Sequence, residues 1–133
     1  MILVKTILKK SKTHGVGLYA DEFIPKGTVT WKYVPWFDIS YSDNDLKKMS
    51  KHARNQVIWY GYFDKKSKKH ILCSDDQRFI NHSHNPKKIN IQSTPSKDVA
   101  KKNIKVGEEL LCDYNKFDST YFDRMGIDRK KLR

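Results

Sequence analysis

The sequence predicts one mostly β domain, with several small sheets and one or two short helices, and three observations favour this class. Short runs of β-branched and aromatic residues recur along the chain, separated by Gly, Pro, Asn and Asp turn signals. The chain contains no internal repeat and no strand–helix alternation, which disfavours solenoids and doubly wound parallel sheets. Its 133 residues suit one modest core, since 38% are hydrophobic and 32% are charged.

The first strands are expected near the amino terminus. The apolar and β-branched runs at 2–8, 18–20 and 28–34 predict three strands. Glycine-containing turns at 12–17 and 24–27 separate these strands.

Short helices are expected in two places. Ser42 or Asp43 is suited to cap a helix over 43–53. One face of that helix would carry Leu46, Met49 and Ala53. A second helix is expected in the tail from Phe117 onward, where it would carry Tyr121, Phe122 and Met125.

The remaining strands are expected in the second half of the chain. Residues 56–63 and 70–73 predict a hairpin across the charged loop 64–69. Further strands are predicted at 88–93, where Ile89 and Ile91 share a face, and over 98–104. A turn at 105–108 then precedes the short apolar pair Leu110 and Leu111.

The chain is strongly basic, with a net charge of +12 from 22 Lys and 5 Arg against 15 acidic residues. Its lysines cluster at 9–12, 65–69 and 129–131. Excess positive charge favours nucleic acid or other anionic surfaces, whereas base-specific recognition prefers arginine or asparagine. We expect weak, non-specific nucleic-acid contact at most, and a solvated lysine-rich surface explains the pattern equally well.

The two cysteines, Cys73 and Cys112, are isolated and predict buried thiols rather than a disulfide framework. No apolar run approaches the roughly 18 residues of a membrane span. The amino terminus is apolar and then basic, which is the opposite order to a secretory signal. These features together predict an intracellular protein.

The first stretch that suggests chemistry is HGVGL, from His14 to Leu18. Its two glycines let the backbone approach a ligand closely. A lone GxG is weak evidence, because no third glycine or following helix completes a dinucleotide-binding fingerprint. Taken alone, the stretch is compatible with an ordinary turn.

The second stretch is RFINHSHNP, from Arg78 to Pro86. A metal site requires three or four ligands, and His82 and His84 have no obvious further Cys or His partner. A catalytic histidine would lack a neighbouring nucleophile signature. The favoured interpretation is a hydrogen-bonding wall made by Asn81 and His82, and no metal is expected.

The third stretch is GEELLCDY, from Gly107 to Tyr114. A turn and an acidic pair precede an apolar run that ends on Asp-Tyr. By itself this pattern indicates a strand that ends in a buried tyrosine.

In this order and at these separations, the three stretches resemble the SET domain of protein lysine methyltransferases. GVGLYA followed by IPKGTV is similar to the family's first signature, and RFINHSHNP is similar to its RFxNHSxxPN signature. IKVGEELLCDY is similar to its closing signature, so the resemblance covers roughly residues 4–116. It implies a β-clip fold with a knot-like threading near the closing motif, an exception to the rule against threading.

The resemblance also predicts the domain organisation. We expect a single SET domain over residues 1–133, with a variable insert at 38–66. Many relatives have a cysteine at the position of His84 that joins three later cysteines on zinc, and no cysteine follows Cys112. The segment 116–133 is therefore expected to close the site without a metal.

The activity implied by the resemblance is transfer of a methyl group from S-adenosylmethionine to a lysine side chain of a protein, with S-adenosylhomocysteine as product. The cofactor would lie on one face, and the lysine would reach it through a narrow channel from the other. Only a neutral amine carries the attacking lone pair, and a nearby sulfonium and partial desolvation lower the pKa of the lysine. We therefore expect no strong protein base, and the enzyme would mainly align nitrogen, carbon and sulfur.

Site residues are carried over by their positions in the signatures. Tyr114 matches the catalytic tyrosine, and Tyr33 matches a second tyrosine near the cofactor and channel. Asn81 is expected to bind the amino group of the cofactor, and His82 to meet the adenine largely through its backbone. The full cofactor-binding set is His14, Gly15, Val16, Gly17, Tyr33, Asn81, His82, Tyr114, Phe117 and Tyr121. The substrate channel is expected to include Tyr60, Asn90 and Phe122.

Competing functions remain at this stage. The alternative to the enzyme is a non-catalytic SET-like module that binds basic protein or nucleic acid, which the intact Tyr114, Asn81 and GxG disfavour. The expected partner is a protein with an exposed lysine, such as a histone or another nucleic-acid-associated protein. Such a substrate would use an acidic groove formed by Asp118, Asp123 and Asp128, or be captured on nucleic acid. The number of methyl groups transferred is not predicted.

Overall fold

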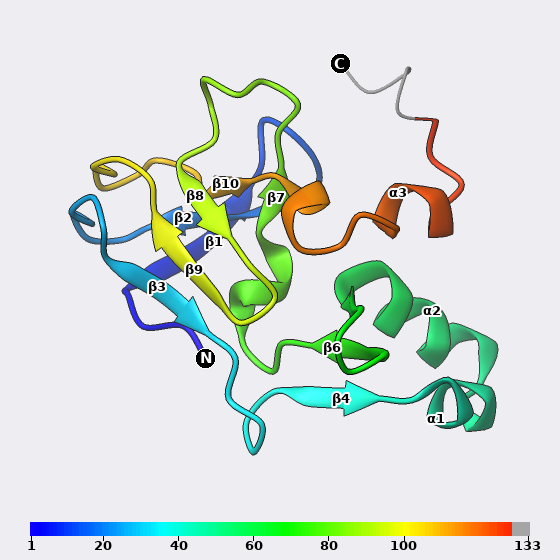
Figure 1. The fold of residues 1–133 in the computed structure, drawn as a ribbon. Helices are drawn as coiled ribbons and strands as arrows, with labels where there is room; N and C mark the ends of the chain where they lie inside the picture. Colours follow the sequence, from blue (N-terminus) through cyan, green and yellow to red (C-terminus); the bar gives the residue numbers. More distant parts are fainter. Residues whose placement is uncertain (129–133) are drawn as a thin grey trace.

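The computed structural model describes residues 1–128, which form four small β-sheets and three short α-helices (Figure 1). The mostly β class is confirmed, although the described helices exceed the expected one or two. The strands are β1 Thr6–Lys10, β2 Val16–Ala20, β3 Val29–Lys32, β4 Ile39–Tyr41, β5 Tyr62–Asp64, β6 Lys69–Leu72, β7 Asn81–His82, β8 Ile91–Ser93, β9 Lys97–Ala100 and β10 Leu111–Cys112. The lysine-rich cluster at 129–131 lies outside the described residues.

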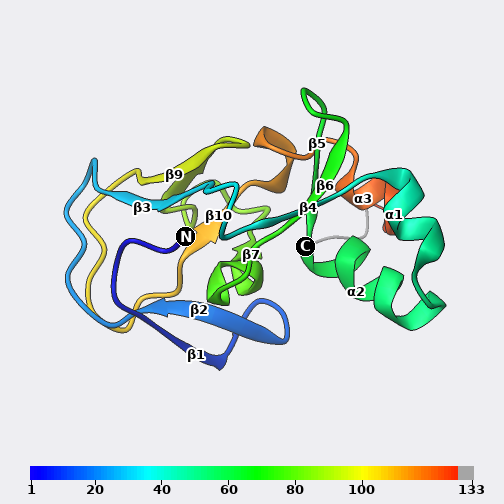
Figure 2. The same cartoon turned by 90° about the horizontal axis from the view of Figure 1, so that it is seen from below.

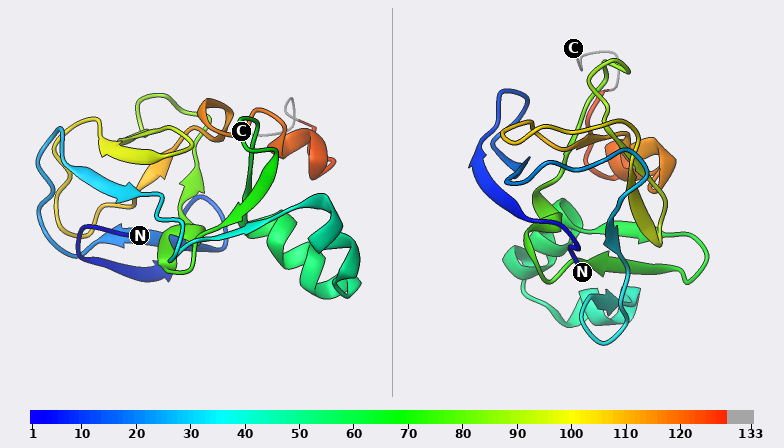
Figure 3. Two further views of the ribbon diagram at one scale, coloured as in Figure 1. Left: turned by 60° about the horizontal axis from the view of Figure 1, so that its bottom comes forward. Right: turned by 90° about the vertical axis from the view of Figure 1, so that its left-hand side faces the viewer.

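Each sheet joins only two or three strands. β1 pairs with β2, β9 lies between β3 and β8, and β6 lies between β4 and β5, all antiparallel. The fourth sheet is a short parallel pair of β7 and β10. Seen from below, the β1–β2 and β3–β9 strands lie at one end of the molecule and the helices at the other (Figure 2). The left view of Figure 3 shows the same separation.

The β1–β2 hairpin closes over the first glycine motif. Gly15 has a φ of +52°, which favours glycine, and its carbonyl accepts the backbone N–H of Ser11 at 2.8 Å. The hydroxyl of Ser11 also accepts the backbone N–H groups of Thr13 and His14 at 2.8 and 3.1 Å. The first strand begins at Thr6, later than expected, and Ile2 instead forms an isolated bridge to Trp31.

The parallel pair β7–β10 brings the second and third motifs together. Leu111 lies opposite Asn81 in this pair, and Cys112 lies opposite His82. Asn90 reinforces the crossing, because its side chain donates to the carbonyl of Glu109 at 2.8 Å and accepts the N–H of Leu111 at 2.9 Å. The RFINHS stretch and the closing motif therefore lie side by side.

The segment between β4 and β5 contains two helices, α1 Asp43–Lys48 and α2 Lys51–Tyr60. The side chain of Ser42 caps α1 as expected, and it forms a reciprocal capping box with Asp45. The strand predicted over 56–63 forms only at its end, where β5 pairs with β6 in the predicted hairpin. Its first five residues are helical, because the side chain of Ser50 caps a second helix that runs through them. None of the helices described within residues 1–128 is long and apolar enough to span a membrane.

Gly61 explains where α2 stops and β5 begins. A Cβ at this position would lie 2.5 Å from the carbonyl oxygen of Val57 and 2.7 Å from that of Ile71. Only glycine allows α2 and β6 to approach this closely. The β-branched and aromatic run around Val57 predicted a strand, but a cap and a close tertiary contact decide its conformation.

Two apolar clusters hold the small sheets together. The larger comprises Leu18, Ala20, Ile24, Ile80, Ile91, Ala100, Ile104, Leu110 and Cys112. The smaller comprises Trp31, Tyr62, Ile71 and Cys73. Burial of each large aliphatic side chain contributes roughly 2 kcal/mol. Ile2 and Phe117 pack against both clusters and so join the two halves of the domain. Both cysteines are buried free thiols, as predicted.

The tail folds back on the helical end of the molecule through Asp118, which is 2% exposed. Its carboxylate pairs with the Arg124 guanidinium of α3, Tyr121–Arg124, at 2.8 Å. It also accepts the backbone N–H of Phe63 in β5 at 2.9 Å and the hydroxyl of Thr120 at 2.8 Å. Asp118 is therefore a structural residue and does not belong to the exposed acidic groove expected from the sequence.

Replacing Asp118 by alanine should lower the free energy of unfolding by about 3 kcal/mol, because Arg124 and the Phe63 N–H lose a buried partner. Urea denaturation followed by circular dichroism measures this difference. Asp21→Ala is the control, since Asp21 forms only an exposed ion pair with Lys5 and should change stability by less than about 1 kcal/mol. Equal effects of the two variants would contradict the role assigned to Asp118.

Candidate active site

A single cavity of about 280 Å³ brings together residues from all three motifs. The first motif lines it with His14, Gly15 and Val16, the second with Ile80 and Asn81, and the third with Tyr114. Helix α2 adds Trp59 and Tyr60, and the tail adds Phe117 and Tyr121. Segments more than 60 residues apart along the chain therefore line the same cavity.

Asn81 joins the three motifs at the mouth of this cavity. Its side-chain NH₂ lies 2.9 Å from the carbonyl oxygen of His14 and 3.0 Å from that of Val16. The same NH₂ lies 3.1 Å from the carboxylate of Glu109 in the closing motif. Since β7 fixes the backbone of Asn81, this amide sets the position of the glycine turn.

Glu109 is the structural counterpart of Asn81 in the third motif. One carboxylate oxygen accepts the Ser11 hydroxyl at 2.6 Å, and the other lies 3.3 Å from the Tyr19 hydroxyl. Gly17 leaves room for this carboxylate, because a Cβ there would lie 2.2 Å from it. The second glycine of the GxG therefore admits an acidic side chain of the closing motif rather than a ligand.

Tyr114 presents its phenol to the cavity in a fixed orientation. Its hydroxyl donates to the carbonyl oxygen of Ile80 at 2.6 Å, so the lone pairs of the phenol oxygen remain available. Burial raises the pKa of Tyr114 well above its ordinary value. The side chain is therefore a neutral phenol at physiological pH.

His82 and His84 bond to each other at 2.9 Å between Nε2 and Nδ1. Nδ1 of His82 accepts the backbone N–H of Tyr114 at 3.0 Å, which requires the hydrogen of neutral His82 to lie on Nε2. Burial, with a smaller effect of His84, lowers the pKa of His82 to about 4. Within residues 1–128, no group of three or more His, Cys, Asp or Glu side chains is placed to hold a metal ion.

An aromatic wall runs from Tyr114 into the smaller apolar cluster. The ring centroids of Tyr114 and Phe117 lie 5.6 Å apart, and those of Phe117 and Tyr62 lie 5.5 Å apart. Tyr62 continues the series to Trp31 at 6.3 Å. Tyr121 packs on Tyr114 at 4.8 Å, so the beginning of the tail lies at the cavity.

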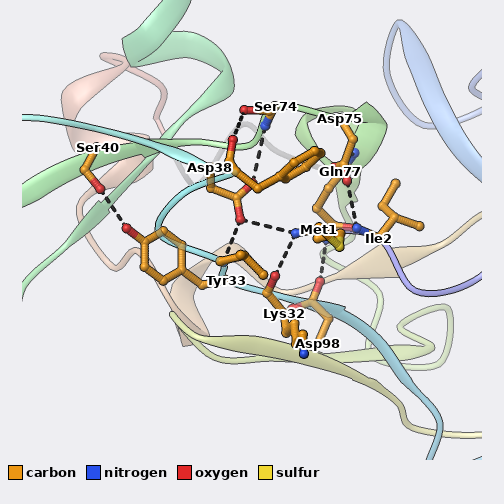
Figure 4. Close-up of polar contacts among 12 residues, drawn as sticks. Met1, Ile2, Lys32, Tyr33, Asp38, Ser40, Ser74, Asp75, Gln77 and Asp98 are labelled. Atoms are coloured by element: carbon orange, nitrogen blue, oxygen red, sulfur yellow. Dashed lines mark hydrogen bonds and ion pairs between the residues drawn. The ribbon is translucent and has the colours of Figure 1, made fainter.

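Several residues predicted for the site do not line this cavity within residues 1–128: Gly17, Tyr33, His82, Asn90 and Phe122. The hydroxyl of Tyr33 bonds to Ser40 at 2.9 Å and braces the link between β3 and β4 (Figure 4). Asn90 holds Leu111, and Phe122 is 4% exposed with its ring centroid 4.9 Å from that of His82. These three side chains support the walls behind the cavity rather than contribute to its surface.

Sequence reasoning missed a buried polar pair that also lines the cavity. Asp98 on β9 accepts the side-chain N–H of Gln77 at 2.6 Å, and both residues are buried. Neither lies in a recognisable motif. A lone aspartate in a lysine-rich strand predicts an exposed position, so the sequence contained no signal for this pair.

Gly17→Ala should displace the Glu109 carboxylate and so release Asn81, with a loss of about 2 kcal/mol of stability. The side-chain NH₂ resonances of Asn81 in a ¹H–¹⁵N spectrum report this change directly. Gly27→Ala is the control, because a Cβ there meets no atom within 4 Å although its φ of +87° is strained. Unchanged Asn81 resonances in Gly17→Ala would show that Gly17 does not control the position of Asn81 through Glu109.

The stability of the protein should fall as the pH drops through the titration range of His82. The folded-state pKa of about 4 lies below the unfolded value near 6.5. The loss of stability caused by protonation of His82 is therefore absent above pH 7 and develops between pH 6.5 and 4. The expected loss is roughly 3 kcal/mol. An NMR titration of the His82 ring gives its pKa. Urea denaturation of the wild type and of His82→Gln across this pH range gives the part of the stability loss that is due to His82. A ring that titrates near 6.5 would contradict this description.

Known proteins resemble this chain in sequence and structure. The SET domain family model matches residues 15–115. The histone-lysine N-methyltransferase trr of Drosophila melanogaster is 32% identical over 117 residues, which is 84% of this chain and 5% of that protein. The chain therefore spans a small part of this curated relative.

Solved structures give the same picture of the fold. Polycomb Repressive Complex 2 from Chaetomium thermophilum matches with a TM-score of 0.65 and 22% identity, over 92% of this chain and 17% of that chain. A form of this complex bound to S-adenosylmethionine matches with a TM-score of 0.61 and 22% identity, over 91% of this chain and 16% of that chain. An apo form with mutations in Ezh2 matches with a TM-score of 0.65 and 25% identity, over 91% of this chain and 16% of that chain. The three sequence signatures, the arrangement of small sheets and the family match over residues 15–115 show that this chain belongs to the SET-domain family.

Proposed function

We propose that this domain is an S-adenosylmethionine-dependent protein-lysine N-methyltransferase. One observation carries the proposal: Tyr114, Asn81 and the glycine turn of the first motif line the same cavity, although they come from three distant parts of the chain. A curated relative is a histone-lysine N-methyltransferase, and one structure of similar fold contains S-adenosylmethionine.

The polar groups at the mouth of the cavity suit the methionine end of this cofactor, which carries an ammonium and a carboxylate. The carbonyl oxygens of His14 and Val16 and the side-chain oxygen of Asn81 can accept from an ammonium, because the Asn81 NH₂ is already engaged with His14, Val16 and Glu109. Trp59 and Tyr121 offer aromatic faces to the adenine. When bound, the cofactor supplies an electrophilic methyl group on a positively charged sulfur.

Tyr114 would orient the reacting groups. Its hydroxyl hydrogen is committed to the Ile80 carbonyl, so its oxygen presents only lone pairs to the cavity. A substrate amine can donate to this oxygen, which aims the nitrogen lone pair at the methyl carbon. The aromatic wall of Phe117 and Tyr62 excludes water and packs the aliphatic stem of the lysine.

The substrate is proposed to be a protein lysine presented on an anionic assembly, such as a histone on nucleic acid. With a net charge of +12 the domain repels a free basic tail, and Asp118 does not supply an acidic groove because it is buried and paired. Surface lysines would instead contact phosphates. The relative from Drosophila melanogaster, a histone-lysine methyltransferase, supports this substrate class.

The second candidate is a non-catalytic module that binds basic protein or nucleic acid. The lysine-rich composition is the observation that favours it. The fixed, neutral phenol of Tyr114 inside a polar-mouthed cavity favours the enzyme, because simple binding of a basic partner requires neither feature.

Tyr114→Phe should reduce methyl transfer about 100-fold, since one oriented hydrogen-bonding group is lost. The assay incubates the protein with tritiated S-adenosylmethionine and nucleosomes or a cell extract, and mass spectrometry identifies the modified lysine. Tyr41→Phe on β4 is the matched control and should retain full activity. Cofactor binding without any transfer in the wild type would favour the non-catalytic module.

A further inference from the structure

The cavity has an exposed end and a buried end. Val16 and Trp59 are 47% and 41% exposed, and they mark its mouth. Trp31, Gln77 and Asp98 line the same cavity and are only 2%, 6% and 3% exposed. The closed end therefore carries a carboxylate, a carboxamide and an indole rather than a purely apolar surface.

The carboxylate of Asp98 has no cation beside it. The neutral amide of Gln77 donates to it at 2.6 Å, and the neutral side chain of Ser93 lies opposite it in the sheet. None of the ion pairs found within residues 1–128 includes Asp98, although the chain carries 27 lysines and arginines. A buried carboxylate without a counter-charge is strongly unfavourable, so the missing charge has to come from a ligand or from a proton.

The position of this carboxylate is fixed from two sides. Asp98 lies opposite Trp31 and Ser93 in the β3–β9–β8 sheet. Gln77 lies in a 3₁₀ turn, Asp76–Phe79, whose backbone is capped by the Asp75 side chain at 3.2 Å. Asp75 in turn accepts the backbone N–H of Ile2 at 2.7 Å, and Figure 4 shows the Gln77 amide directed at Asp98. A ligand would therefore meet a preorganised acceptor.

Trp31 adds a second unsatisfied group at the closed end. Its indole N–H is buried and has no hydrogen-bond partner within the described part of the chain. The aromatic wall from Tyr114 through Phe117 and Tyr62 ends on this same indole. A cation with an alkyl stem fits such a path, because the aromatic faces pack the methylene groups and also attract positive charge.

We propose that Asp98 is the counter-charge that receives the ε-ammonium of the substrate lysine and accepts its proton before methyl transfer. This inference rests on the proposed function and adds to it the protein base that the sequence did not predict. A proton moves from Lys–NH₃⁺ to Asp98–COO⁻, which leaves Lys–NH₂ and Asp98–COOH, and the neutral amine then moves to the Tyr114 oxygen beside the methyl group. The nitrogen lone pair then forms the N–CH₃ bond while the S–CH₃ electron pair stays on sulfur, and Asp98 later releases its proton to solvent.

The electrostatics of the site are consistent with this exchange. Burial raises the pKa of Asp98 to about 7, and hydrogen bonding from Ser93 and Gln77 opposes part of that rise. The carboxylate can therefore take up and release a proton near physiological pH. The titratable groups that interact with Asp98 are the thiols of Cys73 and Cys112, whose pKa values burial raises, so both stay neutral.

The first test compares the wild type with Asp98→Asn, which removes the charge and keeps the shape. The profile of kcat/KM against pH should rise through about 7 in the wild type. In the variant kcat/KM should fall about 100-fold and lose that inflection, with an unchanged affinity for S-adenosylmethionine. The control is Asp76→Asn, an exposed neighbour of Gln77, which should behave as wild type. An active Asp98→Asn with the wild-type profile overturns the proposal.

The second test does not require catalysis, so it separates this proposal from the proposed function. n-Butylammonium is titrated into the protein while the Trp31 indole resonance is followed by NMR, and n-pentanol serves as the uncharged probe. The ammonium should shift this resonance in the wild type and not in Asp98→Asn. A wild type that binds n-butylammonium but transfers no methyl group refutes the methyltransferase function alone. Equal shifts in the two proteins, or none in the wild type, overturn the role of Asp98.

Discussion

The contact between Asn81 and the three groups around its amide is the interaction on which the rest of the site depends. The NH₂ of Asn81 reaches the carbonyls of His14 and Val16 and the carboxylate of Glu109. The first motif contributes two partners to this contact, the closing motif contributes one, and the second motif contributes Asn81 itself. Without it, the glycine turn, the RFINHS strand and the closing strand would be separate surface features with no common cavity.

The fold explains how such a short chain can keep this contact buried. Its sheets are small, and none alone covers a core, so apolar residues from distant segments form two clusters that Phe117 and Ile2 connect. The aromatic wall continues from the smaller cluster to Tyr114. The described part of the tail is anchored by Asp118 and packs Tyr121 on Tyr114, so it forms one side of the cavity.

Much of the fold and the mouth of the site could be predicted because their signals are local. Gly15 marks the hairpin turn, Ser42 marks a helix start, and the motifs that contain His14, Asn81 and Tyr114 have recognisable spacings. The strand predicted over 56–63 is helical over its first five residues, because its β-branched composition is overruled by the Ser50 cap and the tight contact at Gly61. Tertiary contacts of this kind leave no pattern in a single sequence.

The polar groups at the closed end of the cavity could not be predicted from the sequence either. Asp98 and Gln77 meet only because β9 pairs with β3 and a capped 3₁₀ turn faces that sheet. Tyr33 and Asn90, which the signatures suggested for the site, form hydrogen bonds in the structure that support the surrounding backbone. Sequence motifs identified the groups at the mouth, whereas the chemistry at the far end follows from long-range packing.

The central claim is that the Asn81 contact builds a site for S-adenosylmethionine, and isothermal titration calorimetry tests it most directly. The wild type should bind one equivalent of the cofactor, and Asn81→Ala should weaken the affinity at least about tenfold, as expected for the loss of hydrogen bonds to charged groups. Asn103→Ala is the control, because Asn103 only accepts a backbone N–H from Lys26 in an exposed turn. No heat of binding in the folded wild type, or equal affinities for wild type and Asn81→Ala, would contradict the account.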